Sequence, residues 1–319
     1  MKTKPQVFNM INDLKLNEQL IENIKNRSID QLFIYQQEGA KNYIDNKKDN
    51  MNMSNIDDYL SMFKKIGMKK NEKIAILSLG CGDAEQEKYI LSKLDPELNI
   101  HYYGVDSSLK MLDYAKKNMK DVSFHQDYIC ADFSSQQFRR HIQSSLSGFD
   151  KRIFIFWRTL PNIKLTNIVD TFYNIMEEKD ILWMDAKMRS GSTQLSFFQD
   201  SELYQKHHLQ NPQFIKFCFS SLRAAGFSST DGEFKIKSAI DPAQKSLECT
   251  FIFKLNKTKT LTFNTEILHI DKNEEITVLK IMNFDKKGVI EFFEKRDFHY
   301  IGYCEHNRIG QFMFEKKAS

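Results

Sequence analysis

The stretch Lys73-Ile-Ala-Ile-Leu-Ser-Leu79 is a continuous apolar run of strand length, and it ends abruptly at Gly80-Cys81-Gly82. A helical pattern starts directly afterwards, at Asp83-Ala84-Glu85. A buried strand that stops at two glycines lets the backbone approach a ligand closely, while the free N–H groups of the next helix point at that ligand. The stretch therefore predicts a turn that holds a nucleotide-type cofactor, although tight strand-to-helix turns in other α/β proteins share this pattern.

The next predicted strand, His101-Tyr-Tyr-Gly-Val-Asp106, ends in an acid. Ser107-Ser108 then caps an amphipathic helix that runs from Leu109 to Asn118. A carboxylate in this position can bind two ribose hydroxyls, and its spacing after the glycines is close to the roughly 20 residues found in dinucleotide folds. The alternative is that Asp106 only marks the start of the helix.

A third strand-like segment, Val122-Ser-Phe-His125, is followed by Tyr128-Ile-Cys-Ala-Asp132-Phe133. An acid beside an aromatic ring can recognise the adenine amino group and cover the adenine ring. We therefore predict that Asp132 and Phe133 contact a base.

A fourth apolar strand, Lys151-Arg-Ile-Phe-Ile-Phe-Trp157, runs into Arg158-Thr-Leu-Pro-Asn162. Polar residues at the carboxyl end of a central parallel strand face the ligand crevice, so Asn162 is better placed for binding than for packing. The alternative is that Asn162 caps a helix after Pro161.

With these elements in this order, the sequence resembles the class I S-adenosylmethionine-dependent methyltransferases. The resemblance implies S-adenosyl-L-methionine as cofactor. The cofactor-binding positions that it implies are Gly80, Cys81, Gly82, Asp106, Ser107, Asp132, Phe133 and Trp157. The position of Cys81 between two glycines favours a small buried filler over a nucleophile.

Within this class the chain is most similar to the ergothioneine-pathway histidine Nα-methyltransferases and their relatives, which methylate amino-acid-type amines. The matching stretches are Phe33-Ile-Tyr35-Gln-Gln-Glu-Gly39-Ala, Thr159-Leu-Pro-Asn162, Asp180-Ile-Leu-Trp-Met-Asp185 and Phe284-Asp-Lys-Lys-Gly-Val289. The first resembles the family's tyrosine-x-x-x-glycine opening, and the second its threonine-x-glycine-asparagine turn. The matches span nearly the whole chain.

The same resemblance implies three residues at the catalytic centre. Asn162 would hold the amine or carboxylate of the substrate, Tyr35 would shape the mouth of the pocket, and Tyr204 would supply a phenol. Tyr35 could instead pack within the N-terminal segment, because tyrosine is ordinarily amphipathic filler. Tyr204 could be a surface phenol.

The chain also departs from the family pattern. Ser78 stands where methyltransferases commonly have an acid, and Ala84 replaces a third glycine. Leu279 and Ile281 occupy the positions at which the histidine-methylating enzymes have a glutamate and a serine that receive the substrate. Because an apolar pair can neither pair with an ammonium nor bind an imidazole, we do not expect free histidine to be the substrate.

Composition limits the remaining classes. The net charge of +4, from 46 basic and 42 acidic side chains, is too small to imply a nucleic-acid groove. The five cysteines have no metal or disulfide spacing, which favours a reducing cytoplasm, and the eight histidines show no metal-ligand spacing. No signal peptide and no apolar run of the roughly 20 residues needed to span a membrane is visible.

The pattern predicts an α/β fold with two domains. Helical periodicity extends to about Asn50 and includes Phe8 and Ile11, and strands then alternate with helices, as in a Rossmann-like, doubly wound, mostly parallel sheet that closes with a C-terminal antiparallel hairpin. Residues 56–190 and 284–319 would form the cofactor domain. Residues 1–55 and 191–283 would form an α+β substrate domain that is helical from Gln194 to Leu222 and β-rich from Glu233.

We therefore expect a methyltransferase that acts on the nitrogen of a small amine or amino-acid-like metabolite. The resemblance places this substrate in a cleft between the two lobes. The alternatives are a protein or RNA methyltransferase, or a non-catalytic cofactor-binding partner subunit. No nucleic-acid or membrane partner is expected, and the sequence does not indicate an oligomeric state.

Overall fold

The computed structural model describes residues 5–48, 56–157, 165–191, 194–241, 246–263 and 266–318. The chain divides into two compact units. The first, which we call the sheet unit, comprises Met1–Ile11, Asn52–Met188 and Phe284–Ser319. The second, which we call the insert unit, comprises Asn12–Met51 and Arg189–Asn283. The residues before Asn12 therefore belong to the sheet unit, in contrast to the predicted first boundary.

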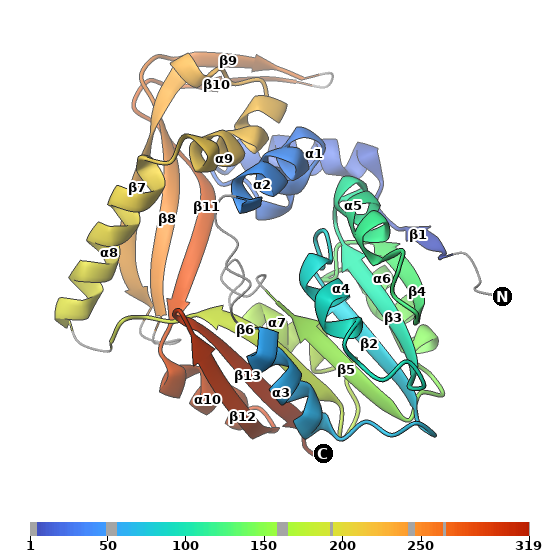
Figure 1. The fold of residues 1–319 in the computed structure, drawn as a ribbon. Helices are drawn as coiled ribbons and strands as arrows, with labels where there is room; N and C mark the ends of the chain where they lie inside the picture. Colours follow the sequence, from blue (N-terminus) through green and yellow to red (C-terminus); the bar gives the residue numbers. More distant parts are fainter. Residues whose placement is uncertain are drawn as a thin grey trace. The chain divides into compact units, whose positions relative to one another are not determined.

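The sheet unit contains an eight-stranded sheet in the order β1-β4-β3-β2-β5-β6-β13-β12 (Figure 1). Its strands are β1 Val7–Asn9, β2 Lys73–Leu79, β3 Asn99–Asp106, β4 His125–Cys130, β5 Lys151–Phe156, β6 Ile181–Lys187, β12 Phe298–His306 and β13 Ile309–Lys316. The pairings from β1 to β6 are parallel, whereas β13 is antiparallel to both β6 and β12. This order confirms the predicted doubly wound sheet with its C-terminal hairpin.

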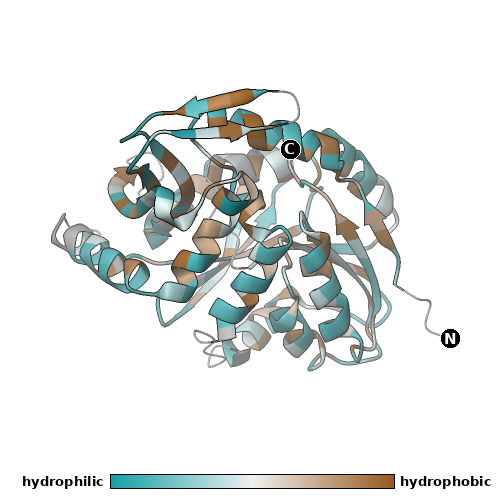
Figure 2. Ribbon diagram, turned by 90° about the horizontal axis from the view of Figure 1, so that it is seen from above, coloured by the Kyte–Doolittle hydropathy of each residue, from teal (hydrophilic) through white to brown (hydrophobic). Residues whose placement is uncertain are grey.

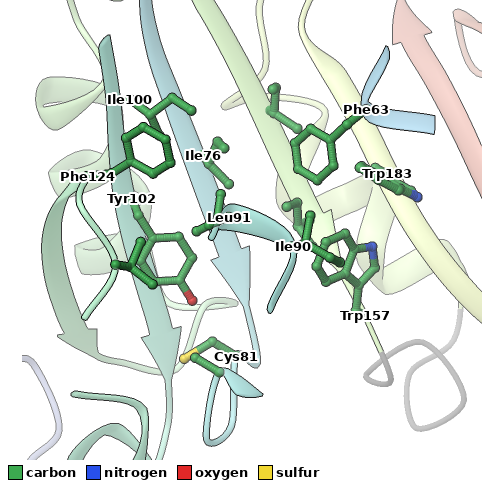
Figure 3. Close-up of a cluster of buried hydrophobic side chains, with 14 of the residues drawn as sticks. Phe63, Ile76, Cys81, Ile90, Leu91, Ile100, Tyr102, Phe124, Trp157 and Trp183 are labelled. Carbon is green, nitrogen blue, oxygen red and sulfur yellow. The ribbon is translucent and has the colours of Figure 1, made fainter. Parts of the chain in front are cut away.

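Helices cover both faces of this sheet, as the alternation of strands and helices requires. They are α3 Ile56–Ile66, α4 Glu85–Leu91, α5 Leu109–Met119, α6 Gln136–Ser145, α7 Leu165–Phe172 and α10 Lys286–Glu294. One apolar cluster joins α3, α4 and α5 to one face, and ten of its side chains are labelled in Figure 3. On the opposite face the ring of Phe172 packs against Phe156, and Phe293 stacks on Phe314. Several helices alternate between hydrophilic and hydrophobic residues, as amphipathic helices do (Figure 2).

The C-terminal hairpin turns at Asn307 and Arg308, whose φ angles are +47° and +63°. His306 pairs with Ile309, so these two residues form the whole loop. Two left-handed residues define the turn whose twist matches that of the flanking strands, and asparagine tolerates this conformation well.

Two segments differ from the sequence expectation. Phe8 lies in β1, which pairs with β4 at the edge of the sheet, and the first helix starts only after Asn12, whose side chain caps it. Val122–Phe124 is not a strand, because β4 begins at His125. Val122 and Phe124 are apolar side chains that are buried in the core after α5. A short apolar run of this kind predicts burial, but it does not distinguish a strand from a buried loop.

The insert unit has its own core and two small sheets, in the orders β11-β8-β7 and β10-β9. Its elements are α1 Asp13–Lys25, the 3-10 helices η1 Gln31–Tyr35 and η3 Ser229–Asp231, α2 Glu38–Lys48, α8 Gln194–Leu209, α9 Pro212–Ala224, β7 Gly232–Asp241, β8 Ser246–Leu255, β9 Lys259–Thr262, β10 Ile267–Ile270 and β11 Glu275–Phe284. The helical stretch after Gln194 forms two helices, because Asn211 caps a new helix that begins at Pro212.

Within the described residues, the helices are too short or too polar to cross a lipid bilayer.

Candidate functional site

The turn after β2 is built on left-handed backbone at both glycines. Gly80 has a φ of +67° and Gly82 a φ of +57°. A Cβ atom on Gly82 would lie 3.2 Å from Cε of the flexible Met111 side chain, so the left-handed conformation is the main reason that glycine is favoured there. The N–H of Cys81 donates to the carbonyl of Val105 at 2.9 Å, which ties the turn to the neighbouring strand β3.

Asp106 ends β3 and contacts this turn directly. Its Oδ2 accepts the N–H of Gly82 at 3.0 Å, and its Oδ1 accepts the N–H of Ser108 at 2.9 Å. These bonds fix the carboxylate against the glycine turn, although 24 residues separate Asp106 from Gly82 in the sequence. A carboxylate offers about four acceptor sites, so it can still accept a hydrogen bond from a ligand hydroxyl.

The environment of Asp106 also changes its ionisation. Only 8% of the residue is exposed. Burial is the main cause that raises the pKa of its carboxyl to about 6, and the charge of Asp83 acts in the same direction. The N–H groups of Ser108, Gly82 and Ser107 oppose this shift because they stabilise the carboxylate. The structure therefore places Gly80, Cys81, Gly82, Asp106 and Ser107 close to one another, and their contact with the cofactor stays a prediction.

Cys81 is 7% exposed and packs in the apolar cluster, with its sulfur directed towards Tyr102 (Figure 3). Burial, followed by the charge of Asp106, raises the pKa of this thiol well above its usual range. A protonated, buried thiol is a poor nucleophile, in line with a packing role.

Sequence reasoning missed Glu87, a buried acid close to the turn. The hydroxyl of Ser78 donates to Oε1 of Glu87 at 2.6 Å, and Glu87 is only 5% exposed. An acid is therefore present beside Ser78 after all, supplied by α4 instead of by the strand. The sequence feature that could have revealed Glu87 is its position on the same buried side of α4 as Ile90 and Leu91, where an acid is unusual.

Ala84, in the place of a third glycine, has a φ of +51° and is the first residue before α4. A left-handed alanine carries a strain of about 1 kcal/mol that glycine would not. The position therefore keeps the backbone shape of a glycine while its methyl group, fully buried, fills the core.

Asp132 and Phe133 follow β4 and have local partners. Oδ1 of Asp132 accepts the N–H and the hydroxyl of Ser134 at 2.8 and 2.6 Å, a turn that Asp commonly forms. The Phe133 ring lies 5.7 Å from that of Phe156 and 6.1 Å from that of Phe172. Both residues are only partly buried. Their contact with a base stays a prediction.

Trp157, at the end of β5, is 5% exposed. Its ring lies edge-on to Tyr59 and Trp183, with a centroid distance of 4.9 Å to each (Figure 3 labels both tryptophans). Tyr59 in turn donates its hydroxyl to Oδ2 of Asp185 at 2.8 Å. Trp157 thus packs in the core at the carboxyl edge of the sheet, and its role in cofactor binding stays a prediction.

The residues predicted for the substrate are spread over several segments. Asn162 lies outside the described residues. Tyr204 belongs to α8, but its side chain is outside the description. Tyr35 ends η1 within the insert unit, where its ring lies 5.4 Å from that of Tyr43 and 5.3 Å from that of Phe217. Of these three side chains the structure describes that of Tyr35 alone, so their grouping at one site stays a prediction.

Leu279 and Ile281 both lie on β11. Leu279 is 2% exposed inside the apolar cluster of the insert unit, and the half-buried Ile281 packs against that cluster. The pair therefore presents no polar side chain where the resembled enzymes have two.

A doubly wound sheet with a glycine turn after one strand and an acid at the end of the next is typical of enzymes that bind a nucleotide-type cofactor, among them the S-adenosylmethionine-dependent methyltransferases. The chain belongs to the family described as histidine-specific methyltransferase, SAM-dependent, whose family model matches residues 16–313. It is therefore a methyltransferase enzyme with S-adenosylmethionine as its cofactor. This family does not favour the alternatives of a protein or RNA methyltransferase or of a non-catalytic subunit.

Several solved structures are similar at low identity. A protein described as an S-adenosylmethionine-dependent methyltransferase from Listeria monocytogenes is 11% identical, with a TM-score of 0.40 over 82% of this chain and 99% of that chain. An O-methyltransferase family protein from Burkholderia thailandensis is 8% identical, with a TM-score of 0.42 over 82% and 55%. DhpI in its complex with SAH is 10% identical, with a TM-score of 0.43 over 95% and 99%. No curated protein matches the chain.

Proposed function

We propose that this enzyme transfers the methyl group of S-adenosylmethionine to the nitrogen of a small amine or amino-acid-like metabolite that carries an apolar part, and that free histidine is not its substrate. The observation that carries this proposal is the pair Leu279 and Ile281, which stands where the family resemblance implies a glutamate and a serine. Leu279 is buried in the apolar cluster of the insert unit and Ile281 packs against it, so neither side chain offers a hydrogen-bond partner to the ammonium or imidazole of histidine.

The residues around the glycine turn fit the cofactor. We propose that the backbone of Gly80, Cys81 and Gly82 lies against it, and that Asp106 and Ser107 bind its ribose. The fit rests on the fixed Asp106 carboxylate, which retains the capacity to accept a hydroxyl hydrogen bond. When bound, the cofactor supplies a methyl group already activated by its sulfonium charge, so the protein does not need to activate the donor.

The remaining task of the protein is to align the attacking amine and to exclude water. The amine must be neutral to attack, so its proton passes first to water or to a nearby base. We propose Asn162 as the residue that holds the amine or carboxylate, with Tyr35 and Tyr204 shaping the pocket. We also propose that Asp132 and Phe133 contact the adenine, and that Trp157 belongs to the cofactor-binding residues.

The pH dependence of cofactor affinity follows from the pKa of about 6 for Asp106. The ionised carboxylate accepts hydroxyl hydrogen bonds, whereas its protonated form has less acceptor capacity. We therefore expect affinity for S-adenosylmethionine to be constant well above pH 6 and to fall below it, by up to about tenfold per pH unit. Isothermal titration between pH 5 and 8 checks this, since binding below pH 6 should also release a proton.

The matched control is Asp106→Asn, which keeps the side-chain shape but does not titrate. Its affinity should be weaker and should lose this dependence on pH. An unchanged pH profile in the variant would assign the titration to another group.

Substrate preference is tested with a panel of small amines, including histidine, and with S-adenosylhomocysteine as the measured product. We expect at least one amine with an apolar side chain to be methylated with a kcat/KM at least about 100-fold above that for histidine, because a buried polar group without partners costs several kcal/mol. Equal or better turnover of histidine would contradict the proposed substrate class while leaving the methyltransferase class intact.

All five cysteines are free thiols, four of them buried. This supports the prediction of a reducing, cytoplasmic location.

A further inference from the structure

A cluster of three metal-ligating side chains lies near the amino ends of β3 and β4 in the sheet unit. Nε2 of His101 lies 3.0 Å from Oδ2 of Asp127, and Nε2 of His125 lies 3.6 Å from the same oxygen. His101 and His125 are direct partners in the parallel register, and Asp127 is two residues further along β4. Since side chains alternate across a strand, the three lie on the same face of the sheet.

The second polar atom of His101 and that of Asp127 already have hydrogen-bond partners within the protein. Nδ1 of His101 contacts the hydroxyl of Tyr103 at 3.3 Å, and the two rings stack at 4.1 Å. Oδ1 of Asp127 accepts the N–H of Gln6 at 2.9 Å. Outer partners of this kind orient the inner atoms of metal ligands. Here they direct Nε2 of His101 and Oδ2 of Asp127 towards each other.

The spacing of the three atoms suits a bound cation. Two ligand atoms at about 2.1 Å from a metal are about 3.0 to 3.4 Å apart at octahedral and tetrahedral angles. The observed 3.0 Å lies in this range and the observed 3.6 Å is slightly above it, and the three ligand atoms all lie within 4.8 Å of one another. The His101 and Asp127 side chains are 21% and 11% exposed, whereas that of His125 is 40% exposed, which gives an ion a path from solvent.

We propose that His101, His125 and Asp127 bind one divalent transition-metal ion, with Zn²⁺ as the type case, and that water fills its remaining positions. Two imidazoles and one carboxylate are a ligand set that suits such ions better than Mg²⁺ or Ca²⁺. The site ties β3 to β4 and to Gln6, so its role is to stabilise the edge of the sheet.

This site is separate from the methyl-transfer centre. Asp106 lies five residues beyond His101 on β3, which corresponds to about 17 Å along a strand. Its side chain also points to the opposite face, because five is an odd number of residues. Metal binding should therefore raise the unfolding temperature without changing the affinity for S-adenosylmethionine.

The test uses the full chain without a histidine tag, stripped of metal with a chelator. Co²⁺ is titrated into the protein while its visible absorption is recorded, and Zn²⁺ is then added as a competitor. In a second experiment the unfolding temperature is measured with and without Zn²⁺. We expect one equivalent of Co²⁺ to bind and Zn²⁺ to displace it. His125→Ala should abolish this binding, and Tyr103→Phe should weaken it about tenfold, as outer-partner changes typically do.

His207→Ala is the matched control, because His207 and His208 also form an adjacent histidine pair. It should retain one equivalent of Co²⁺. Without metal, the His125→Ala variant should unfold at nearly the same temperature as the metal-free wild type, which separates a loss of metal binding from a loss of folding. If His125→Ala does not fold, Asp127→Asn provides the same comparison.

The proposal is overturned if the wild type binds no Co²⁺, if the ligand variants bind as well as the wild type, or if His207→Ala removes the binding.

Discussion

Replacing Asp106 by alanine should reduce the affinity of the enzyme for S-adenosylmethionine by about 100-fold or more. A hydrogen bond to a charged group contributes about 1.5 to 3 kcal/mol, so losing the contacts to two ribose hydroxyls reaches this range. The N–H of Gly82 would also lose its acceptor, which would release the glycine turn from the end of β3. Isothermal titration calorimetry with the wild type and the variant measures the difference.

The control for this prediction is Asp113→Ala, which removes an exposed acid from α5, the helix that follows Asp106. Asp113 forms only a surface ion pair with Lys116, so its loss should change neither binding nor stability by much. Near-ultraviolet circular dichroism should confirm that both variants keep the wild-type fold. An affinity of folded Asp106→Ala within threefold of the wild type would remove Asp106 from the site.

The second large effect is expected for Gly39→Ala in the insert unit. A Cβ atom on Gly39 would lie 1.8 Å from the carbonyl oxygen of Ile34 and 2.8 Å from its carbonyl carbon. These are backbone atoms, so no side-chain rotation can relieve the overlap, and either η1 or the start of α2 must move. We expect a loss of about 3 kcal/mol in the free energy of unfolding, the upper end of the usual range for one substitution.

Urea unfolding checks this prediction, because tryptophan fluorescence reports on one unit and far-ultraviolet circular dichroism on both. Both tryptophans, Trp157 and Trp183, belong to the sheet unit. The fluorescence transition should change little, whereas part of the circular dichroism should be lost at a lower urea concentration as the helices of the insert unit unfold first. Lys41→Ala, an exposed change on the same helix, should stay within about 0.5 kcal/mol of the wild type. Wild-type stability in Gly39→Ala would mean that η1 and α2 are arranged differently.

This steric constraint also explains the tyrosine-x-x-x-glycine pattern from which the family resemblance was drawn. The glycine permits α2 to start directly behind η1, and this close approach places Tyr35 at the end of η1 beside Tyr43 and Phe217. The motif is therefore a backbone requirement at Gly39, whether or not the tyrosine contacts a substrate.

The sequence was sufficient to predict the sheet, because strand-length apolar runs alternate with capped amphipathic helices from Lys73 to Trp157. It also predicted that Asp106 and the glycine turn would meet, since both end neighbouring parallel strands. The carboxyl ends of such strands lie at one edge of the sheet, so two local signals become one site without further information.

Other features depend on contacts that linear spacing does not contain. The short strand β1 exists because β4 offers it hydrogen bonds, not because Val7–Asn9 has a strong pattern of its own. Glu87 reaches Ser78 from a helix, and His101 meets His125 only through the register of β3 and β4. Trp157 and Phe133 follow strand ends, where a ring can cover a ligand or pack in the core. The sequence pattern does not separate these two roles.

The central claim is that S-adenosylmethionine binds over the glycine turn with its ribose on Asp106. A crystal structure with S-adenosylhomocysteine tests it most directly. We predict that the ribose hydroxyls lie within about 3.2 Å of the Asp106 carboxylate oxygens, in hydrogen-bonding range, with the backbone of Gly80 to Gly82 against the ligand. A ligand bound elsewhere, or one whose ribose is held by other residues while Asp106 contacts only Gly82 and Ser108, would contradict the account.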